Sequence, residues 1–158
     1  MNRILQVVLF LTAVTVVLGA NCPAGYYKRF GGNCYKIWAE KKRWAEAHIL
    51  CGTENAHLVT LNDQLESDWV NSFFINNRRH DCGKYYWIGL TDLPNEGVWT
   101  WLADNSPVHY TKWNTGEPNN SGDEDGVQVD SELNKWNDSG AWMFSECFIC
   151  ELDPDAMC

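Results

Sequence analysis

The chain has 158 residues, with 12 basic and 21 acidic side chains, so its formal charge is −9 at neutral pH. This length fits one ordinary domain. The negative charge argues against binding to nucleic acids or anionic membranes, because both require clustered lysine and arginine. The 9 tryptophans, 6 tyrosines and 6 phenylalanines argue against disorder, because they supply a large apolar surface to bury. Seven cysteines in so short a chain indicate an oxidising compartment or a metal cluster.

The N-terminal segment favours the oxidising compartment. A positive charge at Arg3 precedes a predominantly apolar run over residues 4–18, and the small residues Gly19 and Ala20 follow it. This order is typical of a cleaved secretory signal peptide, and no second hydrophobic run follows that could span a membrane. We therefore expect a signal peptide over residues 1–20 and one secreted, extracellular domain over residues 21–158, with disulfides and without membrane insertion.

Two helices are expected in the first half of the domain. Between Glu40 and Cys51, the spacing of apolar residues predicts a helix whose inner face carries four side chains, Trp44, Ala47, His48 and Cys51. We interpret His48 as a packed histidine, because a zinc site would need more nitrogen or sulfur ligands than Cys51 alone supplies.

A second helix is predicted after Asn62, which is a favourable N-cap residue. Its apolar stripe contains Leu65, Trp69 and Phe73, and we interpret these side chains as core.

The sequence pattern of the second half of the chain predicts strands of a sheet, interrupted by a long loop. Residues 85–90 form a buried-strand type of run, residues 98–101 alternate like a strand, and residues 147–152 close the chain with another strand. Between Asp104 and Ser139, Asn, Asp, Gly, Pro and Ser dominate, and a long irregular segment inside a compact domain is usually functional. Helices followed by a sheet indicate an α+β fold.

The long segment is rich in hard oxygen donors, which select calcium rather than zinc or copper. These donors are Glu117, Asn119, Asn120, Asp123, Glu124, Asp125, Asp130, Asn137 and Asp138. A solvated acidic loop would fit the composition equally well. The mixture of carboxylates with amides around Pro118 favours calcium, because amides add ligands without adding repulsion.

Three motifs in this half resemble those of one known family. Trp87–Leu90, Glu117–Asn119 and Trp136–Asp138 match the WIGL, EPN and WND motifs of C-type lectin carbohydrate-recognition domains. The resemblance extends from Cys22 to Leu152. It implies the C-type lectin-like α+β fold, in which two helices and antiparallel sheets accompany a long calcium-binding loop.

The resemblance also implies two sets of calcium ligands. The set that would bind calcium and sugar together is Glu117, Asn119, Glu124, Asn137 and Asp138. The set of an auxiliary calcium site is Asp92, Glu96, Asn120 and Asp125. By the same resemblance, the peptide bond between Glu117 and Pro118 is expected to be cis.

The implied function is calcium-dependent carbohydrate binding without catalysis. In the family, the Glu-Pro-Asn order accompanies mannose, glucose and N-acetylglucosamine, whose vicinal hydroxyls complete the coordination of the metal. The expected partners are glycans on cell or microbial surfaces, and defence against microbes is the common role of secreted relatives.

Two other classes of function compete with this interpretation. A mineral- or matrix-associated structural protein would use the same fold and the negative charge, but its signature, a broken EPN motif or missing ligands, is not seen. A glycosidase with Glu117 and Asp138 as its acid pair is disfavoured, because carboxylates committed to a metal stay ionised.

The cysteines depart from the family pattern. The family's usual bridge beside the ligand loop is absent, because Gly126 occupies its first position and Ala141 or Trp142 stands near its second. The resemblance implies Cys22–Cys34 and Cys51–Cys150 as pairs. Of the remaining three cysteines we expect Cys82–Cys158 to pair within the chain. Cys147 would then be available for a disulfide-linked homodimer.

Overall fold

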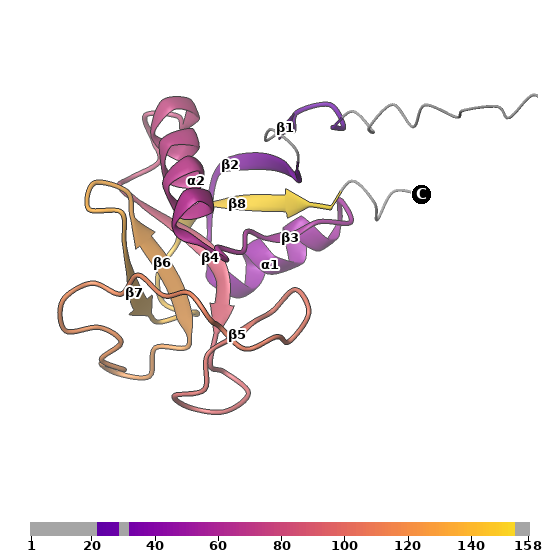
Figure 1. The fold of residues 1–158 in the computed structure, drawn as a ribbon. Coiled ribbons are helices and arrows are strands. Elements are labelled where there is room, and N and C mark those ends of the chain that lie inside the picture. The colour runs from indigo at the N-terminus through magenta and orange to yellow at the C-terminus, as the bar shows by residue number, and fades with distance from the viewer. Residues whose placement is uncertain (1–21, 29–31, 154–158) are drawn as a thin grey trace, which may run out of the picture.

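The computed structural model describes residues 22–28 and 32–153, so the expected signal peptide lies outside the described residues. Within them, two helices and eight strands form one α+β unit (Figure 1). The strands follow the order β1-β2-β8-β4-β6-β7, with β3 added to β8 and β5 added to β4. The elements are β1 (Tyr27–Lys28), β2 (Cys34–Lys42), α1 (Trp44–Gly52), β3 (His57–Leu58), α2 (Gln64–Asn77), β4 (Tyr85–Thr91), β5 (Thr100–Trp101), β6 (Gly126–Asp130), β7 (Lys135–Ser139) and β8 (Glu146–Leu152). The expected fold class is confirmed.

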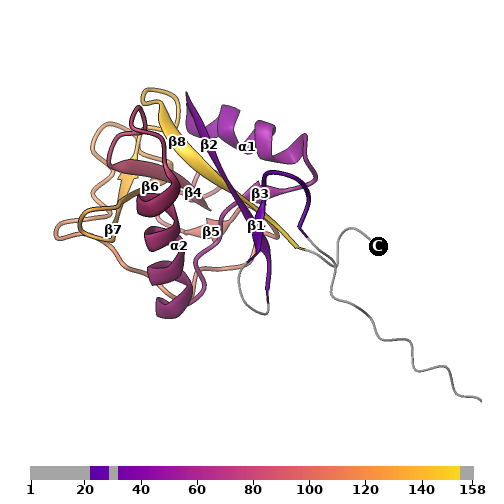
Figure 2. The same ribbon diagram turned by 90° about the horizontal axis from the view of Figure 1, so that it is seen from above.

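The alternation of side chains along the central strands divides the core in two. Tyr86 and Ile88 of β4 point into the cluster that contains the buried face of α2, whereas Trp87 joins the cluster that contains α1. Phe148 of β8 faces α1 in the same way. The two helices accordingly lie on opposite sides of the β2–β8 pair (Figure 2).

The first helix is shorter than its periodicity predicts. It begins at Trp44, because residues 40–42 belong to β2, whose last residue Lys42 pairs with Glu146 of β8. Sheet pairing therefore overrides the helical pattern there. Trp44, Ala47 and Cys51 form the buried face as expected, and the half-buried His48 ring stacks against Trp44.

The second helix differs from the prediction at its start. Its N-cap is Asp63 rather than Asn62, because the Asp63 carboxylate accepts a hydrogen bond of 2.7 Å from the backbone N–H of Glu66. Leu65, expected in the core, is 75% exposed. The buried face instead carries Val70 and Phe74 together with Phe73, which was expected there.

The segment between Asp104 and Ser139 is less irregular than the composition predicts. It contains the hairpin of β6 and β7, in which Val127, Val129 and Trp136 are fully buried. Upstream, the strand expected over residues 98–101 is reduced to β5, and Val98 is half exposed. Strand structure is limited to the two residues that pair with β4, because Thr100 lies opposite Thr91 and Trp101 lies opposite Leu90.

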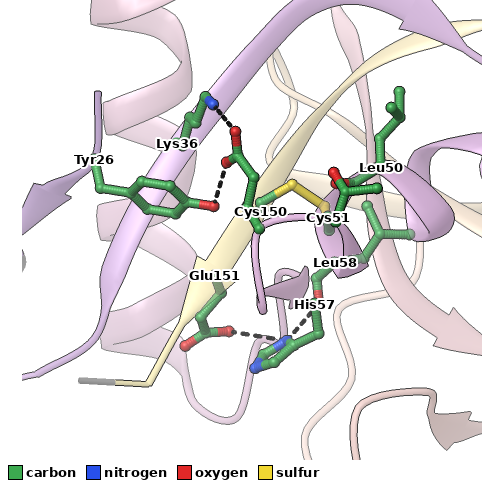
Figure 3. Close-up of a disulfide and its surroundings, with 10 residues drawn as sticks. Tyr26, Lys36, Leu50, Cys51, His57, Leu58, Cys150 and Glu151 are labelled. Carbon is green, nitrogen blue, oxygen red and sulfur yellow. Dashed lines mark hydrogen bonds and ion pairs between the residues drawn. A yellow bond between two sulfur atoms is a disulfide. The ribbon is translucent and has the colours of Figure 1, made fainter. Parts of the chain in front are cut away.

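Both disulfides implied by the family resemblance are present. Cys22–Cys34 closes the β1–β2 hairpin, and Cys51–Cys150 joins the end of α1 to β8 (Figure 3). Beside the second bridge, Tyr26 and Lys36 both bind the carboxylate of Glu54, at 2.8 and 2.5 Å.

The expected pairing of Cys82 with Cys158 is wrong. Cys82 pairs with Cys147, whose backbone lies at the start of β8 beside Tyr86 of β4. Cys147 is therefore not available for a second chain, and the seventh cysteine, Cys158, lies outside the described residues.

The position of the missing family bridge is filled by packing. An ideal Cβ built on Gly126 would lie 3.4 Å from the Cβ of Ala141 and 3.1 Å from the indole of Trp44. Gly126 and Ala141 thus stand where the two cysteines would meet, and the Trp44 ring covers them.

Gly89 of β4 lies close to the backbone of the segment that follows β3. Its N–H donates to the carbonyl of Val59 at 2.9 Å, and a Cβ on Gly89 would lie 2.7 Å from the carbonyl oxygen of Leu58. No side chain fits between these two segments unless the backbone shifts.

We therefore expect Gly89→Ala to lower the free energy of unfolding by about 1–3 kcal/mol, as overpacking does. Urea unfolding measures this change. The matched control is Gly52→Ala at the end of α1, where a Cβ would meet nothing within 4 Å. Equal midpoints for the two variants would contradict the packing argument.

Candidate functional site

The register of three neighbouring strands positions the residues of the site. Thr91 at the end of β4 pairs with Gly126 at the start of β6, and Gly126 pairs with Ser139 at the end of β7. Asp92 directly follows Thr91, and Asp125 directly precedes Gly126. Because β4 and β6 are antiparallel, the two acids lie side by side. This end of the sheet, where the arrow of β4 points, carries the long loops (Figure 1).

Three carboxylates meet at this end. Oxygen atoms of Asp92, Glu96 and Asp125 all lie within 4.8 Å of one another. Hydrogen bonds hold two of these residues in place. The backbone N–H of Gly97 donates to the Asp92 carboxylate at 2.9 Å, and the Thr91 hydroxyl donates to the backbone carbonyl of Asp125 at 2.6 Å. These are three of the four residues expected at the auxiliary site.

The fourth expected residue, Asn120, lines a small cavity together with two of these acids. The cavity has a volume of about 140 Å³ and is lined by Asp92, Glu96, Gly97, Trp99, Pro118, Asn120 and Asp138. Because Asp138 was expected in the sugar-binding set, the two expected ligand sets are contiguous.

Asp138 organises the second set. Its Oδ2 accepts hydrogen bonds from the backbone N–H groups of Asn119 and Asn120, at 2.9 and 2.7 Å. The Asn119 amide donates to the carboxylate of Glu117. The expected cis bond between Glu117 and Pro118 is present.

Two further expected ligands stand at the edge of this set. Glu124 accepts a hydrogen bond from the N–H of Ser121 at 3.0 Å, and its own N–H donates to Asn120 at 2.7 Å. Asn137 is half-buried on β7 beside Asp138, and among the described residues nothing donates to its buried Oδ1.

Unpartnered oxygens are concentrated here. Asp92 Oδ1, Asn137 Oδ1 and Asp138 Oδ1 are buried and receive no hydrogen bond within residues 22–28 and 32–153. Leaving a buried polar atom unpaired costs free energy. Hard cations held by the two expected ligand sets would satisfy these oxygens, so the donors fit calcium.

The acids also repel one another. Burial, and then contact with Asp138, raises the pKa of Glu117 to about 7. Burial first and nearby carboxylates second raise the pKa values of Asp92, Glu96, Glu124 and Asp125 above their ordinary range. Either a proton or a cation would relieve this repulsion.

The loop that carries Glu117 is tied to the sheet by Trp136. Trp136 is fully buried, and its backbone N–H donates to the carbonyl of Lys112 at 2.9 Å. Its backbone carbonyl accepts from the N–H of Asn114 at 2.8 Å. Its ring meets those of Trp113 and Tyr110 edge to face.

Helix α2 adds a second tether. Asp68 accepts hydrogen bonds from Lys112 at 2.9 Å and from Asn134 of the β6–β7 turn at 2.7 Å. The sequence carries no signal for this contact, because the three residues are far apart in the chain. Trp99, which lines the cavity, was equally missed as a site residue.

Comparisons with known proteins agree with the fold. The model of the Lectin C-type domain matches residues 40–152. A perlucin-like protein of Mytilus galloprovincialis is 40% identical over 119 residues, which span 75% of this chain and 74% of the relative.

Solved structures of other proteins are also similar to this chain. The mouse scavenger receptor C-type lectin carbohydrate-recognition domain has a TM-score of 0.73 at 34% identity, covering 84% of this chain and 96% of that one. The cow CD23 domain, solved in the presence of GlcNAc2Man3 oligosaccharide, has a TM-score of 0.70 at 28% identity, with 83% and 95% covered.

The chain therefore belongs to the C-type lectin family, a carbohydrate-binding and non-enzymatic fold whose members generally bind calcium. The three disulfides formed among the described residues fit an extracellular member. Within the described residues, neither helix has the length and apolar character needed to cross a membrane.

The repulsion in the acidic cluster can be tested without any ligand. In chelator at pH 8, we expect Asp92→Asn to stabilise the protein by on the order of 1 kcal/mol, because it removes a buried charge whose Oδ1 has no partner. Thermal unfolding measures the change, with exposed Asp104→Asn as the control. A destabilised Asp92→Asn protein would contradict the electrostatic argument.

Proposed function

We propose that the protein binds carbohydrates of the mannose, glucose and N-acetylglucosamine class in a calcium-dependent manner and without catalysis. The observation that carries this proposal is the set of three buried, unpartnered oxygens on Asp92, Asn137 and Asp138. Asp92 and Asp138 line the acidic cavity, and Asn137 directly precedes Asp138 on β7. A cavity built for a neutral ligand alone would not gather mutually repelling carboxylates.

Two sets of side chains would hold calcium. The set that also binds sugar is Glu117, Asn119, Glu124, Asn137 and Asp138, and the auxiliary set is Asp92, Glu96, Asn120 and Asp125. Calcium accepts six to eight oxygens, so it supplies open positions for two vicinal sugar hydroxyls.

The protein's own contribution is the direction of the hydrogen bonds. Ionised Glu117 only accepts from a sugar hydroxyl, whereas the Asn119 amide can donate to one. The backbone N–H groups that hold Asp138 keep the set in place before any sugar arrives.

The expected role of Glu117 and Asp138 as metal ligands supports binding rather than hydrolysis. Both would be committed to the metal as ionised ligands, whereas a glycosidase keeps one of its two carboxyl groups protonated beside the scissile bond. The mixed carboxylate and amide set also favours a sugar site over the mineral- or matrix-associated role that the negative charge would allow.

We also propose where the protein acts and which surfaces it binds. Residues 1–20 would direct secretion, and residues 21–158 would form a single extracellular lectin domain. One shallow site binds a monosaccharide at about the millimolar level, so surfaces with many glycans, such as those of microbes, are the partners that give useful avidity.

The direct test is retention on immobilised mannose. We expect retention with calcium, release by chelator and no hydrolysis of the sugar. Asp138→Asn should abolish retention, because Asp138 belongs to both the cavity and the sugar-binding set. The control Glu132→Gln, an exposed acid on the β6–β7 turn, should be retained. Retention that persists in excess chelator would end the proposal.

Lowering the pH should weaken calcium binding already near neutrality, above the pH at which a site of ordinary carboxylates would lose calcium. With the pKa of Glu117 at about 7, protons compete for this ligand from neutral pH downward. Calorimetric calcium titrations at pH 8, 7, 6 and 5 should show an affinity that already falls between pH 8 and 6. The same affinity throughout this range would refute the prediction.

The order of acid and amide in the EPN motif should set the preference for sugars. Exchanging them in the double variant Glu117→Gln, Asn119→Asp reverses donor and acceptor at constant size and charge. We expect weaker mannose binding and at most a partial gain of galactose binding, measured by competitive elution. Native protein that elutes with galactose but not with mannose would show that the motif has been misinterpreted.

A further inference from the structure

The carboxylate of Asp68 on α2 holds two segments that are far apart in the sequence. Its Oδ1 accepts hydrogen bonds from the Lys112 ammonium group at 2.9 Å and from the Asn134 amide at 2.7 Å. A third donor is the amide of Gln64, one helical turn earlier, at 2.7 Å. These bonds, with those from Gln64 and Lys112 foremost, hold the pKa of Asp68 below its ordinary range, so this side chain is ionised at neutral pH.

The two segments lead into the two halves of the expected sugar-binding set. Asn134 directly precedes β7, which carries Asn137 and Asp138. Lys112 lies in the loop that leads to Glu117. One carboxylate oxygen therefore connects the loop that carries Glu117 to the turn from which β7 begins.

Backbone hydrogen bonds connect Lys112 to the EPN motif. The carbonyl of Lys112 accepts from the N–H of Trp136 at 2.9 Å, and the carbonyl of Trp136 accepts from the N–H of Asn114 at 2.8 Å. The carbonyl of Asn114 in turn accepts from the N–H of Glu117 at 3.1 Å. Because each segment is bonded to the next, a displacement of Lys112 would move Glu117 relative to β7.

Asp68 also orients a second contact between α2 and the loop. The hydroxyl of Tyr110 donates to the side-chain oxygen of Gln64 at 3.0 Å, while the amide nitrogen of Gln64 donates to Asp68. Loss of Asp68 would leave the Gln64 amide free to turn away from Tyr110. Both contacts of the loop with α2 therefore depend on the same carboxylate.

Helix α2 is a rigid support for these contacts. Its inner face lies in the core, and the buried amide of Asn71 donates to the carbonyl of Ser131 at 3.0 Å. The β6–β7 turn is thus joined to α2 by a contact that does not involve Asp68. The loop has less support of its own, because residues 102–125 contain neither a helix nor a strand.

The ion pair should affect the loop more than the whole fold. The Asp68 side chain is 53% exposed, and exposed ion pairs contribute little to the free energy of unfolding. A loop that is ordered before its ligand arrives, however, spares the ligand the entropic cost of ordering it.

We propose that Asp68 is a positioning residue for the candidate calcium site, which holds the EPN loop against β7 before calcium binds. This proposal rests on the proposed function and names a residue on which that site depends. Asp68 acts through Lys112 and the backbone that follows it, without contact with metal or sugar. In its absence calcium itself would have to order the loop, so the calcium affinity would fall.

Hydrogen exchange measured by mass spectrometry tests the loop in calcium-free protein. Wild type is compared in chelator with Asp68→Ala and with the control Asp81→Ala, which removes a 51% exposed carboxylate that pairs with Arg79 at 3.5 Å. We expect faster exchange over residues 112–120 in Asp68→Ala alone, with unchanged exchange over residues 69–77. Equal exchange over residues 112–120 in all three proteins would overturn the proposal. So would faster exchange along the whole chain, because Asp68 would then support the entire fold.

Calorimetric titration measures the consequence for calcium. We expect Asp68→Ala to bind calcium roughly three- to tenfold more weakly than wild type, with unchanged stoichiometry. Asp68→Asn should recover most of this loss, because its amide oxygen still accepts hydrogen bonds from Lys112 and Asn134. Wild-type affinity in Asp68→Ala would overturn this proposal and leave the proposed function intact. A wild type that binds no calcium would refute both.

Discussion

The pairing of Thr91 with Gly126, and of Gly126 with Ser139, is the constraint from which the rest of the site follows. A shift of one residue in either register would turn every side chain of the shifted strand to the other face of the sheet. Buried residues on both faces of β4 forbid such a shift, because Trp87 packs toward α1 while Tyr86 and Ile88 pack toward α2. The core therefore fixes where the acids of the site lie.

The acidic cluster is the electrostatic cost of this arrangement. The fold gathers carboxylates whose pKa values are raised by burial and by each other, and it leaves three buried oxygens without donors. Hydrogen bonds from the loop backbone hold Asp92 and Asp138 in place despite the repulsion. A structure that tolerates such repulsion is preorganised for a cation, since the ligands need not be assembled when the metal arrives.

Much of this could be predicted from the sequence, because the informative residues are local. The strand over residues 85–90, the closing strand and the EPN and WND motifs are each short patterns, and the structure places Asp92, Glu96 and Asp125 together as the family resemblance implies. The individual roles of the ligands in binding remain proposals.

The errors came from contacts between distant residues. Nothing near Cys82 in the chain indicates that β4 and β8 run parallel and bring Cys147 beside it. Pairing with β8 likewise converts residues 40–42 from helix to strand. The exposure of Leu65 and the tether from Asp68 to Lys112 also depend on how α2 meets its neighbours, which helical periodicity does not encode.

The central claim is that calcium and sugar share one set of ligands, and thermodynamic linkage tests it most directly. If sugar hydroxyls complete the coordination of calcium, saturating methyl α-mannoside must raise the calcium affinity by the same factor by which calcium raises the sugar affinity. Calorimetric titration of calcium with and without the mannoside measures this factor. A tighter calcium affinity in the presence of the sugar is the predicted result, and an unchanged affinity would contradict the account.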